Sequence, residues 1–432
     1  MNVNELMERV VRDDVKFITL QFTDLHGVVK ENIIPVKELK TALKSGIWSD
    51  GSSIEGFSRI QESDLYLKPD PNTYIVLPWS ASENTARLIC EIYNPDGTPF
   101  EGDPRLVLKN VINEATEMGF IYNTGPEPEF YLFKDDIPID REGYFDLSSN
   151  YTIIKDMIII LQRFGMHVEN AHHEVGTGQY EIDFEYAPAL ITADRLVTLK
   201  YIVKKVAKMN SLHATFMAKP LMKKAGSGLH IHQSLFNLNN ENLFYDANDD
   251  YRLSDLAYNF MAGQMKHIKE LCAILCPTVN SYKRLVVGYE APVYITWASM
   301  NRSALIRIPK WFEQKPKSAR IELRCPDPTC NPYLAFAVLL KAGLDGIKNK
   351  LEPPEPVEEN VYQLAETDRD KNIDTLPSSL IEALMEMKSS KLIKDTFGEY
   401  LFNRYLSIKI KEWDEFRMHV TEWEREKYMN MY

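Results

Sequence analysis

Hydrophobic and polar residues alternate with a two-residue period over several short stretches of the chain, and this period is typical of β-strands with one buried face. The first stretch, "VKFITLQFTDLHGVVKENIIPV" at 15–36, predicts two strands joined at "DLHG". The segment that follows, "VKELKTALKSG", predicts a helix that ends at Gly46. Together these elements indicate a small α+β unit at the N-terminal end.

The rest of the chain mixes helical patterns with short strands. Apolar residues recur with helical spacing around 104–119, 150–165, 192–210, 252–275 and 331–348. Such a mixture favours an antiparallel sheet with helices packed outside it. The Pro-, Gly- and Asp-rich segment "YNPDGTPFEGDPR" predicts a domain boundary. We therefore expect an α+β fold with two domains, 1–102 and 103–432.

Four of the predicted strands carry polar or ionisable side chains along one face. Strand by strand they are Glu127 and Glu129 in "GPEPEF"; Glu181, Asp183 and Glu185 in "GQYEIDFEY"; His230, His232 and Ser234 in "GSGLHIHQSLF"; and Arg320, Glu322 and Arg324 in "ARIELRC". One interpretation is that each face meets water, as one face of an antiparallel sheet often does. A solvated face should mix Lys, Thr and Gln, whereas these faces carry Glu, His and Arg. We therefore favour faces that converge on one cavity.

The glutamates of "GPEPEF" raise a question of charge, because Glu127 and Glu129 would point to the same face of a strand. Crowded carboxylates of this kind are tolerated only beside cations. Oxygen ligands with an occasional imidazole suit Mg²⁺ or Mn²⁺ better than Zn²⁺. We therefore predict two hard divalent cations, one for each glutamate. Pro128 lacks an amide donor, which predicts that the strand begins there or lies at a sheet edge.

Two arginines in "NRSALIRIP", Arg302 and Arg307, extend the prediction to phosphoryl transfer. In that reaction metals bridge phosphate oxygens and guanidinium groups absorb the developing charge. Each arginine taken alone could equally be a surface residue. The sequence has neither a P-loop pattern nor G-x-G-x-x-G, so a nucleotide would be bound without a standard phosphate loop.

Composition narrows the class of protein further. The chain has 432 residues and a net charge of −12, which argues against a non-specific binder of nucleic acid or membrane surfaces. Its start does not resemble a signal peptide and no apolar run is long enough to span a membrane, so we expect a cytoplasmic protein. An odd cysteine count does not suggest a disulfide framework. We expect buried thiols at Cys272 and Cys276 rather than a structural zinc site.

Several motifs then resemble, in order and spacing, those of class I glutamine synthetase in its shorter bacterial form. They are "DGSSIEGF", "GPEPEF", "HHEVGTGQYEIDF", "GSGLHIHQSL", "NSYKRLVVGYEAP" and "NRSALIRIP", and the likeness covers almost the whole chain. The resemblance implies a small N-terminal β-grasp-like domain and a larger catalytic domain whose antiparallel sheet forms a funnel-shaped active site. It also implies an ATP-dependent ligase that phosphorylates the γ-carboxylate of glutamate before ammonia displaces the phosphate.

The same resemblance implies roles for individual residues. The metal ligands would be Glu129, Glu174 and Glu181 for the glutamate-side cation, and Glu127, His230 and Glu322 for the nucleotide-side cation, with Mg²⁺ or Mn²⁺ bound. The residues that bind glutamate would include Arg284, Arg324 and the Gly226 backbone, beside Glu129 and Glu174. The residues that bind ATP would be Glu169, Tyr186, His232, Ser234, Arg302, Arg307 and Arg320. The ammonium site would comprise Asp50, Tyr144 and Glu174, and Glu290 would close over it.

In the family the residue matching Asp50 comes from a neighbouring subunit, and two stacked rings of six make a dodecamer. The resemblance therefore implies a homo-oligomer with active sites between subunits. Taken alone, "DGSS" would be read as an ordinary turn. Whether regulatory proteins also bind the assembly is left open by the sequence.

Three residues depart from the family pattern. Ala225 stands where asparagine is usual, so one side-chain contact to glutamate is missing, while Val287 replaces a common proline and Tyr180 a frequent histidine. These departures keep a second interpretation, a related γ-glutamyl ligase that uses a polyamine or an amino alcohol. A third interpretation is a non-catalytic nitrogen sensor, which should have lost metal ligands, whereas every expected ligand position is filled.

Overall fold

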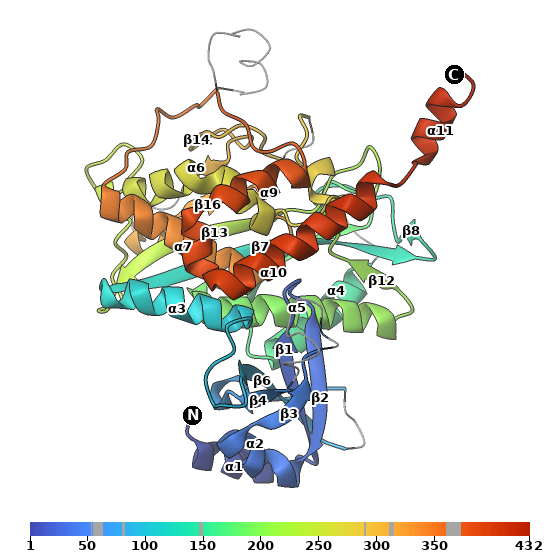
Figure 1. Cartoon of the computed structure of the whole chain (residues 1–432), viewed down its shortest axis with the longest axis vertical. Helices are drawn as coiled ribbons and strands as arrows, with labels where there is room; N and C mark the ends of the chain where they lie inside the picture. The colour runs from blue at the N-terminus through green and yellow to red at the C-terminus, as the bar shows by residue number, and fades with distance from the viewer. Residues whose placement is uncertain are drawn as a thin grey trace.

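The computed structural model describes residues 1–432 except 53, 55–63, 80–82, 147–149, 289–290, 311–314 and 360–372. Two β-sheets organise these residues, a smaller one near the N-terminus and a larger one in the rest of the chain. Figure 1 shows the smaller unit, in blue, below the larger unit and its helices. The α+β class predicted from the sequence is confirmed.

The smaller sheet has the strand order β2-β1-β6-β4-β3, with β5 also paired to β6. Its strands are β1 Phe17–Thr23, β2 Val29–Pro35, β3 Ile47–Asp50, β4 Asp64–Pro69, β5 Ile75–Val76 and β6 Thr85–Tyr93. β1 pairs antiparallel with β2 and parallel with β6, which is a β-grasp arrangement. The helices here are α1 Val3–Arg12 and α2 Leu39–Ser45, and α2 ends at Gly46, whose φ of 78° suits glycine. The predicted hairpin and helix are therefore confirmed.

The larger sheet has the order β14-β15-β16-β13-β7-β10-β9, with β8, β11 and β12 added along β7. Its strands are β7 Phe120–Lys134, β8 Ile137–Pro138, β9 Val168–His173, β10 Gln179–Phe184, β11 Ala187–Pro188, β12 His213–Thr215, β13 Leu229–Asn237, β14 Trp297–Ala298, β15 Ile306–Arg307 and β16 Ile321–Leu323. Its pairings are antiparallel except between β14 and β15. The predicted antiparallel sheet is thus confirmed, and the four strands with polar faces are consecutive neighbours in it.

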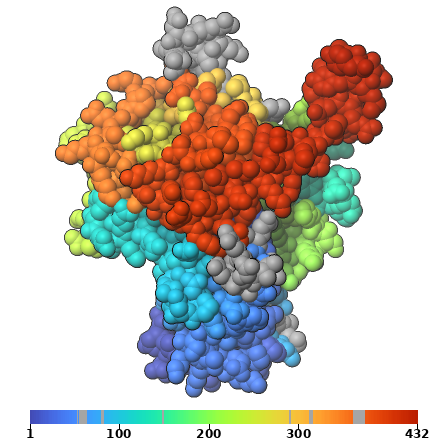
Figure 2. All heavy atoms as spheres, in the orientation of Figure 1, coloured from blue at the N-terminus to red at the C-terminus, as the bar shows by residue number. Residues whose placement is uncertain are grey.

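Helices accompany this sheet, and the first five of them, α3 to α7, lie near the predicted positions. They are α3 Pro104–Glu117, α4 Tyr151–Arg163, α5 Ala189–Met209, α6 Asp255–Leu275, α7 Pro332–Asn349, α9 Leu380–Ser389, α10 Lys391–Arg417 and α11 Glu422–Tyr428. α6 and α7 approach closely at two glycines, because a Cβ on Gly263 would lie 2.2 Å from the Ala342 carbonyl oxygen and one on Gly346 would lie 2.0 Å from that of Asn259. Figures 1 and 2 show α11 projecting away from the body of the molecule.

The prediction that β7 begins at Pro128 or lies at a sheet edge is wrong, because β7 runs from Phe120 to Lys134 in the middle of the sheet. The pairing pattern explains how it tolerates the proline. On one side β13 pairs along residues 120–128, and the Glu129 amide donates to Gly228. On the other side β11 pairs up to Thr124 and β10 starts at Glu129. Pro126 and Pro128 therefore lie between these two pairings. None of the described strands pairs with β7 there on that side, so no hydrogen bond is lost because proline lacks an amide donor.

The two sheets have separate hydrophobic cores, one around Leu6, Ile18 and Leu88 and the other around β7, α6 and α7. Arg105 at the start of α3 joins the two units, since its guanidinium group lies 2.9 Å from Asp70 and from Asp194. The predicted division at residue 102 stays a prediction. Among the described residues, no helix is long and apolar enough to cross a membrane.

Candidate active site

Two adjoining cavities open over the polar face of the larger sheet, and they contain most of the predicted site residues. The larger cavity, of about 590 Å³, is lined by Glu127, Glu129, Tyr144, Glu174, Glu181, Gly226, His230, Arg284, Arg302, Arg307, Glu322 and Arg324. The smaller cavity, of about 260 Å³, is lined by Glu169, Tyr186, His232, Ser234 and Arg320. Glu127 lines both cavities. The predicted convergence of the four strand faces is thus present in the structure, except that Glu185 is exposed and lines neither cavity.

Asp50, a predicted site residue, is not brought to this place. Asp50 is exposed at the end of β3 and lines neither cavity. Its carboxylate accepts hydrogen bonds from the Ser52 hydroxyl at 2.6 Å and the Ser52 amide at 2.8 Å, and these bonds lower its pKa. Glu290, expected to close the site, lies outside the described residues.

Strand register explains why the side chains meet. Glu127 is opposite His230 across β7 and β13, and His232 is opposite Glu322 across β13 and β16. On the other side of β7, Glu129 is opposite Glu181 of β10. Directly opposed residues on one face of an antiparallel pair lie within contact distance. A slip by one residue would turn all of these groups away from the cavity.

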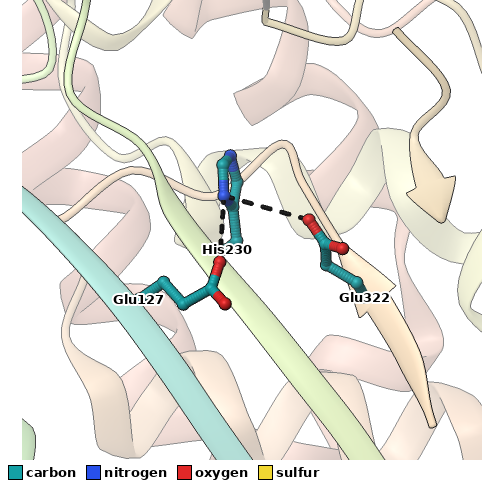
Figure 3. A group of neighbouring side chains, drawn as sticks. All are labelled: Glu127, His230 and Glu322. Carbon is teal, nitrogen blue, oxygen red and sulfur yellow. Dashed lines mark hydrogen bonds and ion pairs between the residues drawn. The ribbon is translucent and has the colours of Figure 1, made fainter. Parts of the chain in front are cut away.

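Glu127, His230 and Glu322 form the first compact group. Figure 3 shows their side chains, from three neighbouring strands, pointing toward one another. His230 Nδ1 lies 3.4 Å from Glu127 and 3.9 Å from Glu322, and potential ligand atoms of all three residues lie within 4.8 Å of one another. The three residues therefore have the spacing of ligands for one divalent cation.

Histidine and arginine neighbours favour the ionised form of the carboxylates in this first group. Burial opposes ionisation of Glu322, but His232, Arg324 and His230 outweigh it and lower its pKa to about 2. Burial likewise opposes ionisation of Glu127, yet His232 and His230 hold its pKa well below the usual value. An ionised oxygen pair beside an imidazole is a donor set that suits Mg²⁺ or Mn²⁺.

The second group is more crowded and centres on Glu181. Glu181 has ligand atoms within 4.8 Å of Glu129 and His230 in one set, and of His172 and Glu174 in another. Burial, Asp183 and Glu129 raise the pKa of Glu181 well above its usual value. Burial and Glu174 raise the pKa of Glu129 to about 7. Carboxylates that resist ionisation together gain most from a cation, so these residues fit the expected second metal.

This charge crowding predicts how the stability of the metal-free protein depends on pH. The folded-state pKa of Glu129, about 7, lies above the unfolded value of about 4.3, so the folded form holds the extra proton between these values. In a chelator we therefore expect the Tm to fall as pH rises from about 5 to about 7. Mg²⁺ should raise the Tm more at pH 8 than at pH 5.5, because binding needs the deprotonated group.

Differential scanning calorimetry at both pH values measures these shifts. In the Glu129→Gln variant, the part of the pH dependence of the Tm that comes from Glu129 should be absent. An Mg²⁺-induced Tm shift that is equal at pH 5.5 and pH 8 would contradict the prediction.

Arginines surround the carboxylates from the β15 and β16 side. Arg307 donates to Glu322 at 2.8 Å, and Arg324 is paired with the other Glu322 oxygen. Arg284, which is 4% exposed, donates to the backbone carbonyls of Cys325, Pro326 and Arg324. These bonds fix guanidinium groups at the cavity wall, where they can receive anionic groups of a substrate.

The smaller cavity continues from the first group through His232. Its Nε2 lies 2.7 Å from Glu127, and Arg320 donates to its Nδ1 at 3.1 Å. Tyr186 lies in the wall of this cavity and is 46% exposed, so its ring is accessible for stacking on a planar base. The arrangement fits a nucleotide whose phosphates reach toward Glu127 and His232.

Sequence reasoning gave no role to two residues that the fold brings to the larger cavity, His172 and Gln179, while Asp183 lines it as its place on the polar strand face predicted. His172 Nε2 lies 2.9 Å from Glu174, and its ring stacks on Phe145 with centroids 4.8 Å apart. The two-residue spacing of Gln179 from Glu181 places both on one strand face, whereas His172 meets Glu181 only through the pairing of β9 with β10. Tyr180, which replaces a histidine frequent in the family, lies on the opposite face of β10 from Glu181. Its hydroxyl donates to Asp140 at 2.6 Å.

Carboxylates, imidazoles and arginines gather over an antiparallel sheet, beside a pocket with an accessible aromatic ring. This combination is typical of the class of enzymes that bind divalent cations and a phosphorylated substrate. Comparison with known families makes the assignment specific. Residues 14–95 match the glutamine synthetase β-grasp domain, and residues 101–428 match the glutamine synthetase catalytic domain. The chain belongs to the glutamine synthetase family, and it is a ligase for ATP-dependent glutamine synthesis.

Individual relatives agree with this assignment over nearly their whole length. The chain is 48% identical over 439 residues to a glutamine synthetase of Methanosarcina mazei, covering 99% of this chain and 97% of the relative. It is 47% identical to a glutamine synthetase of Clostridium saccharobutylicum, with 99% and 98% covered. A solved structure described as a GmaS/ADP complex is 31% identical and superposes with a TM-score of 0.90, covering 98% of this chain and 99% of that chain.

Proposed function

We propose that the two cavities bind glutamate and ATP side by side, and that the γ-carboxylate of glutamate is phosphorylated before ammonia displaces the phosphate. The observation that supports this most strongly is the shared wall at Glu127, which joins a carboxylate- and arginine-lined cavity to a nucleotide-sized pocket. A free carboxylate is a poor electrophile without a good leaving group. Transfer of a phosphoryl group corrects both faults, and it needs the two substrates to be adjacent.

The proposed division of metal ligands follows the two carboxylate groups. Glu127, His230 and Glu322 would hold the cation on the nucleotide side, and Glu129, Glu174 and Glu181 the one on the glutamate side. When bound, such cations would supply positive charge that neutralises the charge developing during phosphoryl transfer. The preference for Mg²⁺ or Mn²⁺ rests on the oxygen-rich donor set.

The arginines would receive the anionic parts of the substrates. Arg302 and Arg307 border the larger cavity and would hold the transferred phosphoryl group, while Arg284 and Arg324 would hold glutamate beside the Gly226 backbone. Arg307 and Arg324 already share Glu322, so their side chains are preorganised rather than free to swing. In the smaller cavity Glu169, Tyr186, His232, Ser234 and Arg320 would contact ATP.

For the amine, we propose a site formed by Tyr144 and Glu174 of one chain and Asp50 of a neighbouring chain. Tyr144 and Glu174 both lie in the cavity wall. Burial raises the pKa of Tyr144, and the charge of Glu174 raises it further. The lowered pKa of Asp50 keeps its carboxylate negative, as attraction of NH₄⁺ requires. Glu290 would close over the site and exclude water from the acyl phosphate.

The proposed assembly is a dodecamer of two hexameric rings in the cytoplasm, with each active site completed by a neighbour. It is supported by the position of Asp50, which is exposed and lines neither cavity of its own chain. A heterologous interface of this kind closes into a ring when a whole number of equal rotations makes one full turn. The domain division at residue 102 belongs to the same proposal.

An assay of phosphate release tests the proposal at the level of the reaction. We expect release to require glutamate, ATP and a divalent cation together, with glutamine as the organic product when ammonium is present. Phosphate release without glutamate, at the rate seen with it, would show that the chain hydrolyses ATP instead.

A further inference from the structure

Two buried side chains hold the loop that borders the larger cavity next to Glu129. This loop, residues 219–228, contributes Lys223, Ala225, Gly226 and Gly228 to the cavity wall. The Tyr131 hydroxyl donates to the Ala225 carbonyl at 2.7 Å, and Gln179 Nε2 donates to the Gly226 carbonyl at 3.1 Å. Both donors are fully buried. The loop is therefore fixed through its backbone, at the position where Ala225 offers no polar side chain of its own.

Gln179 makes a further contact that Tyr131 lacks. Its Nε2 also donates to Glu129 Oε2 at 2.7 Å, and the Gly228 amide donates to the same oxygen at 3.0 Å. Its Oε1 accepts from the Gly176 amide at 2.9 Å, which locks the orientation of the side-chain amide. These two bonds to Oε2 fix the Glu129 carboxylate, which has a potential ligand atom within 4.8 Å of ligand atoms of Glu181 and His230.

The backbone leaves little room for another arrangement. A Cβ on Gly176 would lie 1.9 Å from the Tyr131 hydroxyl oxygen and 2.6 Å from Gln179 Oε1, and one on Gly226 would lie 2.6 Å from the Ala218 carbonyl oxygen. Tyr131 and Gln179 are also directly opposed across β7 and β10. They lie two residues along each strand from the pair Glu129 and Glu181. The two donors thus extend the same polar face as the expected metal ligands.

We propose that Tyr131 and Gln179 are positioning residues with separable tasks. Tyr131 holds only the 219–228 loop, whereas Gln179 holds that loop and orients the Glu129 carboxylate at the same time. The inference rests on the proposed roles of Glu129 in cation binding and of the loop in glutamate binding. It explains how this chain places the loop without a polar side chain at residue 225.

The test compares Tyr131→Phe and Gln179→Met in the assembled full-length protein. Mn²⁺ binding without substrates is followed by electron paramagnetic resonance, and KM values for glutamate and ATP are measured at saturating Mg²⁺. Loss of one hydrogen bond typically changes an equilibrium by about threefold to tenfold. We expect Tyr131→Phe to raise the glutamate KM by that factor and to leave the Mn²⁺ Kd within about twofold. Gln179→Met should raise both quantities.

In both variants the ATP KM should stay near the wild-type value, because the nucleotide pocket lies on the far side of Glu127. A general loss of structure would shift all three quantities together and would overturn the proposal. An unchanged Mn²⁺ Kd in Gln179→Met would also overturn it, as would a Mn²⁺ Kd raised in Tyr131→Phe as much as its glutamate KM. Gln179→Asn, whose shorter amide does not reach Glu129, serves for the same comparison where Gln179→Met does not assemble.

The wild-type protein in the same experiment separates this inference from the proposed function. Wild-type protein that neither binds Mn²⁺ nor uses glutamate would contradict the proposed function itself. Wild-type protein that does both, beside variants without the expected split, would contradict only the positioning roles.

Discussion

The Glu181→Gln enzyme should lose about 10³-fold in kcat/KM while its metal-free form stays at least as stable as the wild type. Glu181 belongs to both sets of neighbouring ligands around the glutamate side, so removal of its charge weakens cation binding there more than loss of any outer carboxylate. Several kcal/mol of charge stabilisation correspond to about this factor in rate. The stability should not fall, because Asp183, Glu129 and Glu127 all oppose ionisation of Glu181 in the folded protein.

Steady-state kinetics at fixed Mg²⁺ and the Tm in a chelator measure the two parts of this expectation. Glu185→Gln is a matched control, since Glu185 lies just beyond the end of the same strand, is exposed and lines neither cavity. Its kcat/KM should stay within about twofold, as exposed substitutions usually have small effects. Glu181→Gln activity within tenfold of the wild type would remove Glu181 from the proposed metal site.

A mixture of two inactive proteins should regain a large share of activity if the active site is shared between chains. Asp50→Ala lacks the proposed amine residue, and Glu322→Ala lacks a ligand of the first group. In a randomly mixed ring with a head-to-tail interface, about a quarter of the sites pair an intact Asp50 with an intact Glu322. We therefore expect about a quarter of the wild-type activity after co-assembly, against almost none for either protein alone.

The control is a mixture of Asp50→Ala with a chain that carries both substitutions, in which no intact Asp50 exists. Native mass spectrometry verifies that the mixed assemblies formed. Mixed assemblies without activity would count against a site completed by a neighbour, and activity in the control mixture would show that Asp50 is not needed.

Alternation along single strands was enough to predict many of the side chains that the larger sheet gathers over the cavities. The i and i+2 spacing in "GPEPEF" and "GSGLHIHQSLF" sets which residues share a face, and antiparallel pairing then brings those faces together. The family resemblance added the roles, including those of Arg284 and Tyr144, which lie on segments without strand periodicity. The helices were found because their apolar positions recur over long stretches, as in α6 and α7.

What the sequence did not reveal depends on contacts between segments far apart in the chain. Pro128 looked like a strand start because proline lacks a donor, but the register places it where β11 has ended and β10 has not begun. Gln179 looked like an ordinary strand residue because its partners, Glu129 and Gly226, lie 50 and 47 residues away. Local propensity carries no information on such pairs.

The choice of amine is the most direct test of the whole account. The proposed cage of Tyr144, Glu174 and a neighbour's Asp50 would offer polar groups to the N–H donors of ammonium, whereas a substituted amine would have to place a carbon chain where one of those groups lies. An organic amine would leave a buried carboxylate unpaired, which reduces specificity by about 10–200-fold. The measurement is kcat/KM for ammonium, putrescine and ethanolamine at fixed glutamate and ATP, with the product identified by mass spectrometry. The account predicts that ammonium is preferred by that factor and that glutamine is formed, and an organic amine with the higher kcat/KM would contradict it.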